Sequence, residues 1–167
     1  MMPDQISSPR LQLQLLRPDD HAFMRVLVNT PGWIRFIGDR NVHSEADARA
    51  YVERIRNTPN LYYWVAWLRD SQAPIGVVSF LKRDYLPHFD IGFAFLPEHQ
   101  GQGYATEGAR AVLDIASGLP EYQLVLATLL PDNAHSIKVL ERLGLRFERT
   151  MEVGGDVLHI YSTAVEN

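Results

Sequence analysis

Four stretches in the first 100 residues carry the apolar patterns of β-strands. In 10–17, leucine alternates with glutamine, which is the period-two pattern of a strand that buries one face. The runs 62–68 and 75–81 are rich in aromatic and β-branched residues, and a polar connection separates them, so we predict an antiparallel pair. The apolar run 89–96 is too short for a typical helix and is flanked by prolines. We predict that it forms a central strand.

Two helices are predicted between these strands. The first covers 18–28, because its Pro-Asp-Asp start places acids at the positive end of the helix dipole and apolar residues follow at helical spacing. The Asn-Thr-Pro-Gly sequence of 29–32 breaks it. The second helix follows Ser44 and Asp47, which are spaced like a helix N-cap pair, and it carries an apolar stripe as far as the break at 58–60.

The second half of the chain alternates strands and helices. A glycine-rich segment, 100–104, follows the strand 89–96. After it the patterns predict a helix over 105–117, a strand over 122–130, a helix over 133–143, and strands over 145–153 and 157–164. An antiparallel first half followed by this alternation predicts a mixed α/β (α+β) fold, with helices covering one sheet. We find no internal repeat or linker, so we expect residues 1–167 to form a single domain.

The composition narrows the classes of protein and of site. Apolar residues make up 46% of the chain and charged residues 22%, as is ordinary for a globular protein. The absence of cysteine excludes disulfides, thiolate metal sites, iron–sulfur clusters and a cysteine nucleophile. The net charge of −4 argues against a nucleic-acid partner and favours a cationic substrate, although surface solvation explains the charge equally well.

The sequence also carries no pattern for export or membrane insertion. Residues 1–16 are polar and interrupted by prolines, unlike a signal peptide. No apolar run approaches the roughly 20 residues that cross a bilayer. We therefore expect a cytoplasmic protein without a membrane partner.

The glycine-rich segment is the first candidate for chemistry. A strand, a turn containing Gly101 and Gly103, and the start of a helix follow one another without a break. Backbone N–H groups in the first turn of a helix have no intrahelical acceptor and carry the positive end of the dipole, so they bind phosphates that glycine allows to approach. The pattern favours an anion site, although Gly-x-Gly alone is more often an ordinary turn.

Other nucleotide and hydrolase motifs fit this sequence less well. A P-loop needs Lys-Ser/Thr after its last glycine, and none is present. A dinucleotide fingerprint needs Gly or Ala where Thr106 stands, so it stays a minor alternative. No two of the six histidines frame a zinc-protease motif, and no Gly-x-Ser-x-Gly elbow occurs. We therefore predict no metal.

With its surroundings, the glycine segment resembles the signature of the GNAT superfamily of acetyltransferases, Gln/Arg-x-x-Gly-x-Gly/Ala. Gln100, Gly103 and Ala105 match this signature. Its longer form is similar to the RimJ/RimL type, which acetylates the N-termini of ribosomal proteins. The matching residues downstream are Asn133, Ser136, Leu140, Glu141 and Gly144. Since the segments 9–11 and 17–20 are similar to this type as well, the resemblance spans nearly the whole chain.

The resemblance implies the fold and the co-substrate. The GNAT fold is a mixed, mostly antiparallel central sheet of about seven strands flanked by about four helices, and its co-substrate is acetyl-CoA. In this family a splayed central strand leaves a cleft, and its backbone, here at Phe93, Ala94 and Phe95, pairs with the pantetheine arm. The CoA pyrophosphate is expected at Gln100, Gly101, Gln102, Gly103, Tyr104, Ala105 and Thr106. Asn133 would hydrogen-bond the pantetheine or act as a plain helix N-cap, and Ser136 would lie near the sulfur.

Acetyl transfer sets two requirements for proton transfer. An amine must lose a proton before it attacks the thioester, and the departing sulfur needs a hydrogen-bond donor. Asp90, in the strand before the loop, is the first candidate for the base. The alternative is that Asp90 has no catalytic role and is simply an exposed residue of the alternating strand. Many family members place a tyrosine donor where this chain has Leu140, so Ser136 is the candidate donor. The alternative is that Ser136 is an ordinary serine on the helix surface. Glu98 and Glu107 rank lower as bases.

The sequence leaves the acceptor open. We expect a primary amine, either the N-terminus of a protein or a small polyamine-like or antibiotic-like molecule. The alternatives are a CoA-binding module without catalysis and an enzyme that uses another acyl-CoA donor. A homodimer is a candidate assembly, because dimers are common in the RimJ/RimL branch. The aromatic residues of the first half lie where the family builds its acceptor groove, but most of them are expected to serve as core residues.

Overall fold

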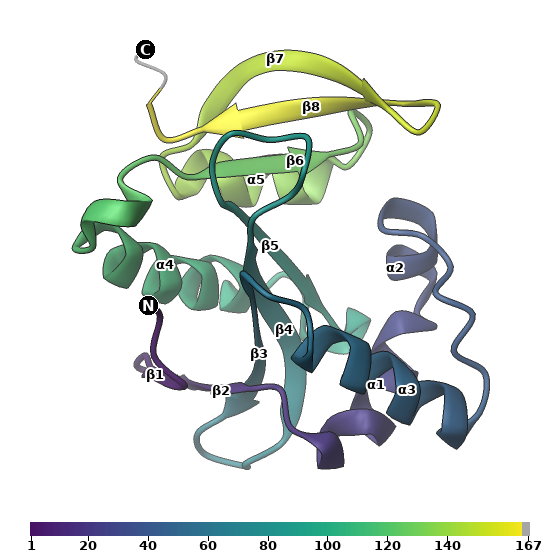
Figure 1. Ribbon diagram of the computed structural model, residues 1–167. Helices are drawn as coiled ribbons and strands as arrows, with labels where there is room; N and C mark the ends of the chain where they lie inside the picture. Colours follow the sequence, from purple (N-terminus) through teal and green to yellow (C-terminus); the bar gives the residue numbers. More distant parts are fainter. Residues whose placement is uncertain (165–167) are drawn as a thin grey trace.

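A computed structural model describes residues 1–164, which form one open sheet with helices on both faces (Figure 1). The strand order is β1-β2-β3-β4-β5-β6-β8-β7. Neighbouring strands pair antiparallel, with the exception of β5 and β6, which run parallel. The mixed, mostly antiparallel sheet predicted from the sequence is therefore confirmed.

The first half of the chain supplies five strands and three α-helices. The strands are β1 (Gln5–Ser7), β2 (Leu11–Leu15), β3 (Leu61–Leu68), β4 (Pro74–Leu81) and β5 (Asp90–Phe95). After β2 a short 3-10 turn, η1 (Pro18–Asp20), leads into the helices α1 (His21–Val28), α2 (Pro31–Phe36) and α3 (Glu45–Arg56). The Ser44 side chain accepts a hydrogen bond from the Asp47 backbone N–H, which confirms the predicted N-cap of α3.

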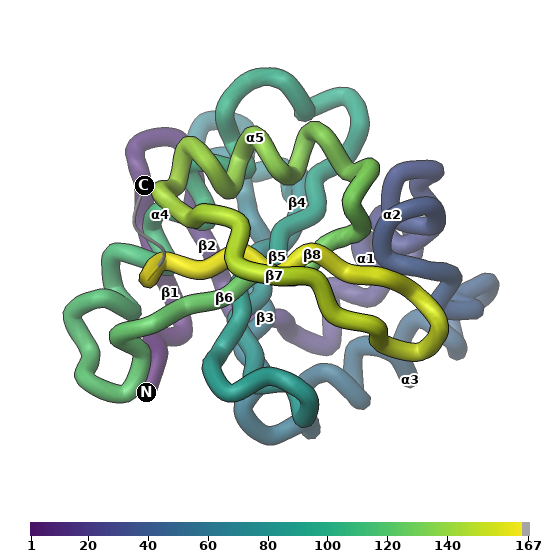
Figure 2. Tube along the Cα trace, turned by 90° about the horizontal axis from the view of Figure 1, so that it is seen from above, coloured from purple at the N-terminus to yellow at the C-terminus, as the bar shows by residue number. Residues whose placement is uncertain are grey.

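The second half begins at the glycine loop. After the 3-10 turn η2 (Pro97–His99) come α4 (Tyr104–Ser117), the turn η3 (Pro120–Tyr122), β6 (Leu126–Leu129), α5 (Ala134–Arg142), β7 (Arg146–Val153) and β8 (Asp156–Ser162). The strands β7 and β8 form a hairpin through Gly154 and Gly155, both at positive φ. Figures 1 and 2 both show the tip of this hairpin on the side of the molecule where α2 lies.

Two hydrophobic clusters fix the helices to opposite faces of the sheet. Alternate residues of β2, including Leu11 and Leu13, are buried against α4, which also contacts Val78 of β4. On the other face, Val65 and Val77 belong to the cluster that contains the buried residues of α1 and α3. Figure 1 shows α4 on one side of β3–β5, with α1 and α3 on the other. The alternation of the central strands therefore decides which helix each residue meets.

The structure corrects several predicted elements. Within residues 1–164 the sheet has eight strands rather than about seven, and there are five α-helices rather than about four. The added strand, β1, has only one buried residue, Ile6, which is too little for a periodic pattern. The added helix, α2, starts at Pro31, where the sequence indicated only a break, because proline is well accommodated in the first turn of a helix.

The strand predicted over 122–130 is also shorter in the structure. Strand β6 begins only at Leu126, since Pro120 starts a 3-10 turn that places Tyr122 in the core. The Tyr122 ring packs edge to face on Phe80 and Phe89, with ring centroids 5.1 Å and 4.9 Å away. The aromatic contact outweighs the β propensity of this segment.

The parallel pair β5–β6 is the irregular part of the sheet. Its register contains a single pair, Asp90 with Leu126, and the Leu126 N–H donates to the Phe89 carbonyl at 2.9 Å. Beyond that point β5 continues to Phe95 without a β6 partner in the described residues. The two strands therefore separate, and no ladder pair joins them beyond Asp90 and Leu126 in the described residues.

A cluster of polar contacts joins the start of β2 to the glycine loop and α4. Glu107 in the first turn of α4 accepts hydrogen bonds from the Ser8 hydroxyl (2.5 Å) and from the Arg10 backbone N–H (2.8 Å) and Nε (2.7 Å). Arg10 Nη1 donates to the Gln102 carbonyl at 3.0 Å, and its guanidinium lies 4.2 Å from the ring centroid of Tyr104. We call these five residues the loop clamp, because they tie the loop to the sheet.

If the loop clamp stabilises the fold, Glu107→Gln should destabilise the protein. The amide cannot accept all of these bonds or balance the Arg10 charge, so the free energy of unfolding should fall by about 1 kcal/mol. Urea denaturation at pH 7 measures the loss. Glu45→Gln is the matched control, because that carboxylate sits in the first turn of α3 but pairs only with the exposed Arg49. An equal loss in both variants would contradict the role of the clamp.

The loss of stability in Glu107→Gln should depend on pH. Burial alone would raise the pKa of Glu107, but hydrogen bonds from Ser8 and Arg10 outweigh it and hold the pKa below its ordinary value. Because the folded pKa is depressed, the stabilisation is present above the ordinary pKa of 4.5 and is lost as the pH falls through the folded value. The difference between the wild type and Glu107→Gln should therefore disappear in acid.

Candidate active site

The glycine loop has the geometry of an anion site. Gly101 and Gly103 both adopt positive φ, at 78° and 83°, and Gly103 is the N-cap of α4. The first-turn amides of a helix have no intrahelical acceptor, and in α4 no side-chain cap at the N-cap position satisfies them. Gln100 Nε2 donates to the Phe95 carbonyl at 3.0 Å and thereby holds the loop against the end of β5. The positive end of the α4 dipole is thus exposed beside a fixed loop.

A cavity of about 270 Å³ lies in front of this helix end. The loop and the start of α4 supply one wall, and α5 supplies the other through His135, Lys138, Val139 and Arg142. Lys138 and Arg142 are four residues apart and therefore lie on the same helix face. The cavity combines helix amides with two cationic side chains, which is the environment that binds phosphates.

A second cavity of about 390 Å³ occupies the region where β5 and β6 separate. Its walls include Gly92–Phe95 of β5 and Ala127–Leu129 of β6. Residues of α2, α3 and β3 extend the lining, and Asn133, Ser136 and Leu140 close it on the side of α5. Phe95, Gln100, Ala105 and His135 line both cavities, so the two are neighbours.

Most of the candidate residues named from the sequence line one of these cavities. The larger cavity is lined by Phe93, Ala94, Phe95, Gln100, Ala105, Asn133 and Ser136. The smaller cavity is lined by Gly101, Gly103, Tyr104 and Thr106. Gln102 lines neither cavity, because its side chain turns back to the Glu98 carbonyl at 3.4 Å. Asp90 also lines neither.

Asp90 lies behind the wall of the larger cavity, at the closed end of the splayed strands. Its exposed fraction is 2%, so the alternative of an exposed alternating residue is wrong. Its Oδ2 accepts from Arg83 Nε at 2.9 Å and from the Thr128 hydroxyl at 3.5 Å, while Oδ1 is buried without a partner in the described residues. Burial raises the pKa of Asp90, and the Arg83 charge opposes that rise only in part.

Asn133 and Ser136 meet at the start of α5. Asn133 is the N-cap of this helix, and its Oδ1 accepts from the Ser136 backbone N–H at 3.4 Å. Both side chains also line the larger cavity, and the Ser136 hydroxyl is not used in this cap. The capping role and a ligand contact are therefore compatible in space for Asn133.

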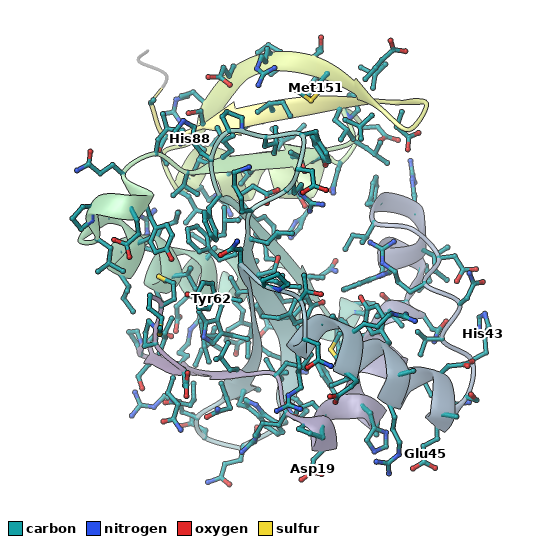
Figure 3. All side chains as sticks on the ribbon, viewed as in Figure 1. Asp19, His43, Glu45, Tyr62, His88 and Met151 are labelled. Carbon is teal, nitrogen blue, oxygen red and sulfur yellow. The ribbon has the colours of Figure 1, made fainter. Side chains whose placement is uncertain are left out.

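Several residues of these walls were not singled out in the sequence. Thr128, Arg83, Lys138 and Arg142 come from a strand, a loop and a helix whose proximity only the fold creates. The sequence could have predicted only the pair in α5, because Lys138 and Arg142 are four residues apart and therefore lie on the same face of a helix. His88, which is labelled in Figure 3, lines neither cavity.

Within residues 1–164 there is no group of three or more His, Asp or Glu side chains arranged to hold a metal ion. In the same part of the chain, no helix combines the length and the apolar character needed to span a membrane.

Comparisons with known proteins agree with the site. The family model described as acetyltransferase (GNAT) domain matches residues 10–146. The chain is 33% identical over 107 residues to the uncharacterized N-acetyltransferase YnaD of Bacillus subtilis (strain 168). That match covers 64% of this chain and 62% of the relative, so it spans less than two thirds of the relative's length.

Solved structures share the fold at low sequence identity. One is the RimL ribosomal L7/L12 α-N-protein acetyltransferase in complex with coenzyme A, with a TM-score of 0.81 and 19% identity over 95% of this chain and 96% of that one. Another is the microcin C7 self-immunity acetyltransferase MccE in complex with acetyl-CoA and AMP, with a TM-score of 0.83 and 17% identity over 98% of each chain. Because the family model covers most of the sequence that builds both cavities, this chain belongs to the GNAT family of acetyltransferases.

Proposed function

We propose that residues 1–167 act as a single acetyl-CoA-dependent N-acetyltransferase domain that transfers an acetyl group to a primary amine within a ternary complex. The observation that carries this proposal is the pair of adjoining cavities, one at the helix end of a glycine loop and one between splayed strands. The first offers amides and cations to phosphates, and the second offers strand backbone without a β6 partner to an amide-rich arm. CoA has both of these parts in one molecule.

The residues of the smaller cavity would hold the pyrophosphate. The amides of Gly101–Thr106 supply the hydrogen bonds, and Lys138 and Arg142 add charge. The backbone of Phe93–Phe95, which has no β6 partner, would pair with the pantetheine arm, and Asn133 would contribute a side-chain hydrogen bond. When bound, acetyl-CoA supplies an activated thioester in the larger cavity.

The transfer then requires balanced proton movements. The amine nitrogen bonds to the acetyl carbon as the carbon–sulfur bond breaks, so the amine loses one proton and the sulfur gains one. Ser136 would donate a hydrogen bond to the sulfur, in the role that a tyrosine would otherwise fill, and the departing thiolate would take its proton from solvent. Leu140 cannot donate such a bond, although it lines the same cavity. Asp90 would receive the amine proton through Thr128, whose hydroxyl reaches it from the cavity wall.

The acceptor within this proposal is a small amine or a protein N-terminus, as in the RimJ/RimL branch. Two features support that breadth: RimL shares the fold over 95% of this chain, and the larger cavity extends from the separated strands to residues of α2, α3 and β3. A cytoplasmic location would provide acetyl-CoA. We also propose that the protein forms a homodimer, because the sequence resembles a branch in which dimers are common.

Binding of acetyl-CoA is the first test of this function. Isothermal titration should show saturable binding of acetyl-CoA and CoA and none of NADH, and thiol release should follow when an amine is added. Gly103→Val should weaken CoA binding at least tenfold, because a β-branched residue resists φ of 83° and fills the approach to the amides.

The matched control for this test is Gly155→Val. This glycine also has a positive φ, 88°, and nothing lies within 4 Å of the added Cβ, but it sits in the β7–β8 turn. It carries similar backbone strain without touching the loop. Equal affinity for CoA in wild type and Gly103→Val would contradict the phosphate assignment.

Ser136→Ala tests the donor to sulfur. The rate constant kcat should fall about tenfold to a hundredfold, while the dissociation constant of acetyl-CoA stays within about twofold, because the hydroxyl acts on the leaving sulfur. Ser117→Ala is the control, since that helix-surface hydroxyl only donates to the Asp114 carbonyl. An unchanged kcat in Ser136→Ala would leave Ser136 as a surface serine.

Asp90→Asn and Thr128→Val test the base. In the wild type the rate should fall as the pH drops through the raised pKa of Asp90, because only its carboxylate accepts a proton. Ionisation of the amine itself causes a separate break. Both variants should remove the break that belongs to Asp90. If the Asp90–Arg83 pair is only structural, Asp90→Asn will lower Tm and keep the break.

A further inference from the structure

The larger cavity has a corner that the transfer step does not use. It is formed by Trp33 of α2, Arg40 of the loop after α2, Tyr51 of α3 and Tyr63 of β3, and we call these four residues the donor corner. All four line the cavity, and the Tyr51 hydroxyl interacts with both the Arg40 guanidinium and the Tyr63 hydroxyl. They come from the first half of the chain, whereas the glycine loop and α5 come from the second.

The charge of the cavity lining is one-sided. Within the described residues, no aspartate or glutamate lines the larger cavity, whereas Arg40, Arg83 and His135 do. Arg83 is balanced by Asp90 at 2.9 Å. Arg40 is exposed and interacts with the Tyr51 hydroxyl, but it has no ion pair with any carboxylate of residues 1–164, so no opposite charge in this part of the chain balances it.

Two acids that neighbour lining residues along the chain are already engaged. Asp39 Oδ1 accepts from the Asn41 N–H at 2.8 Å, and Asp132 pairs with Arg35 at 3.2 Å. Neither carboxylate lines the cavity. A polycationic acceptor would therefore lose hydration there without meeting an opposite charge, which is unfavourable.

The donor corner also holds buried polar hydrogens. Trp33 is 6% exposed, and its Nε1–H has no acceptor in the part of the chain that the structure describes. The Tyr63 hydroxyl is buried as well and interacts with the Tyr51 hydroxyl, so the Trp33 N–H is the donor of this corner that lacks an acceptor in the described residues. An indole N–H can only donate, and a buried donor without an acceptor costs free energy. A ligand that supplies acceptor oxygens would remove this cost.

The two tyrosines stay neutral. Burial raises the pKa of Tyr51 and raises that of Tyr63 well above its ordinary value, and Arg40 lowers each only in part. Both hydroxyls therefore keep their protons at neutral pH and add no negative charge to the corner.

We propose that the acceptor is a small primary amine that carries one anionic group, a carboxylate or a phosphate, which Arg40 and the Trp33 N–H bind in the donor corner. This inference rests on the proposed function, since it names the acceptor of that same site. It replaces the cationic substrate suggested by the net charge of −4, because that charge lies outside the cavity lining. A volume of about 390 Å³ shared with the thioester suits a small molecule.

A panel of matched amines tests the charge preference. Linear aminocarboxylates of increasing chain length are compared with their own amides, with an aminoalkyl phosphate and with 1,4-diaminobutane and spermidine, using thiol release from acetyl-CoA. We expect kcat/KM to be at least tenfold higher for the best anionic amine than for its amide. Comparison of carboxylate with phosphate identifies the anionic group. A preference for the diamine or spermidine overturns the proposal, and so does a preference for peptide N-termini without an acidic group.

Variants of Arg40 assign the preference to the donor corner. Arg40→Gln should raise KM for the anionic amine about tenfold and leave KM for its amide unchanged, and Arg40→Lys should recover part of the loss. Arg56→Gln removes the same charge from the exposed end of α3, away from the cavity, and should change neither value. Equal effects of Arg40→Gln on the anionic amine and its amide overturn the proposal.

Binding separates this inference from the proposed function. If acetyl-CoA binds but no amine is acetylated, titration of the CoA-loaded protein with the anionic amines decides the inference. If acetyl-CoA does not bind, the proposed function fails, and the same titration of the protein alone still decides whether the anion site exists. In either case, saturable binding that Arg40→Gln weakens supports the site, and no binding by the wild type overturns it.

Discussion

The separation of β5 from β6 is the constraint on which the rest of the site depends. A parallel pair that is joined only at Asp90 and Leu126 leaves the remainder of β5 without a strand partner on its β6 side in the described residues. Backbone groups are costly when buried and unpaired, so the gap is useful only where a ligand or water completes the hydrogen bonds. The larger cavity follows from this opening, and the position of the glycine loop follows from the point at which β5 ends.

The loop is held in place from outside the splayed strands. Glu107 belongs to the first turn of α4, where an acid is favourable for the dipole, and it also gathers Ser8 and Arg10 from the start of β2. A helix end whose own amides must stay available to a phosphate cannot be fixed by an ordinary side-chain cap. The clamp provides an alternative support, because it binds the helix through a side chain and the loop through the Gln102 carbonyl.

Charge divides the two cavities into distinct environments. Near the loop, Lys138 and Arg142 add to the helix dipole, whereas the cavity between the strands keeps its one acid, Asp90, behind the wall and paired with Arg83. The acidic net charge of the whole chain says nothing about this arrangement, because carboxylates on the surface are screened by water and salt. Which charges line a cavity depends on the fold and not on their sum.

Local chemistry in the sequence determined much of this protein. The alternation in β2, the N-cap at Ser44 and the glycines at 101 and 103 each act within a few residues, so the pattern alone predicts strand, helix start and loop. The resemblance of Gln100–Ala105 and Asn133–Gly144 to one family then carried the fold and the candidate residues. Only the tertiary structure decided that Asp90 is buried beside Arg83, that Glu107 serves the clamp, and that Trp33, Arg40, Tyr51 and Tyr63 meet at one corner. Those contacts join segments far apart in the chain, and the packing of helices on the sheet, not local propensity, brings such segments together.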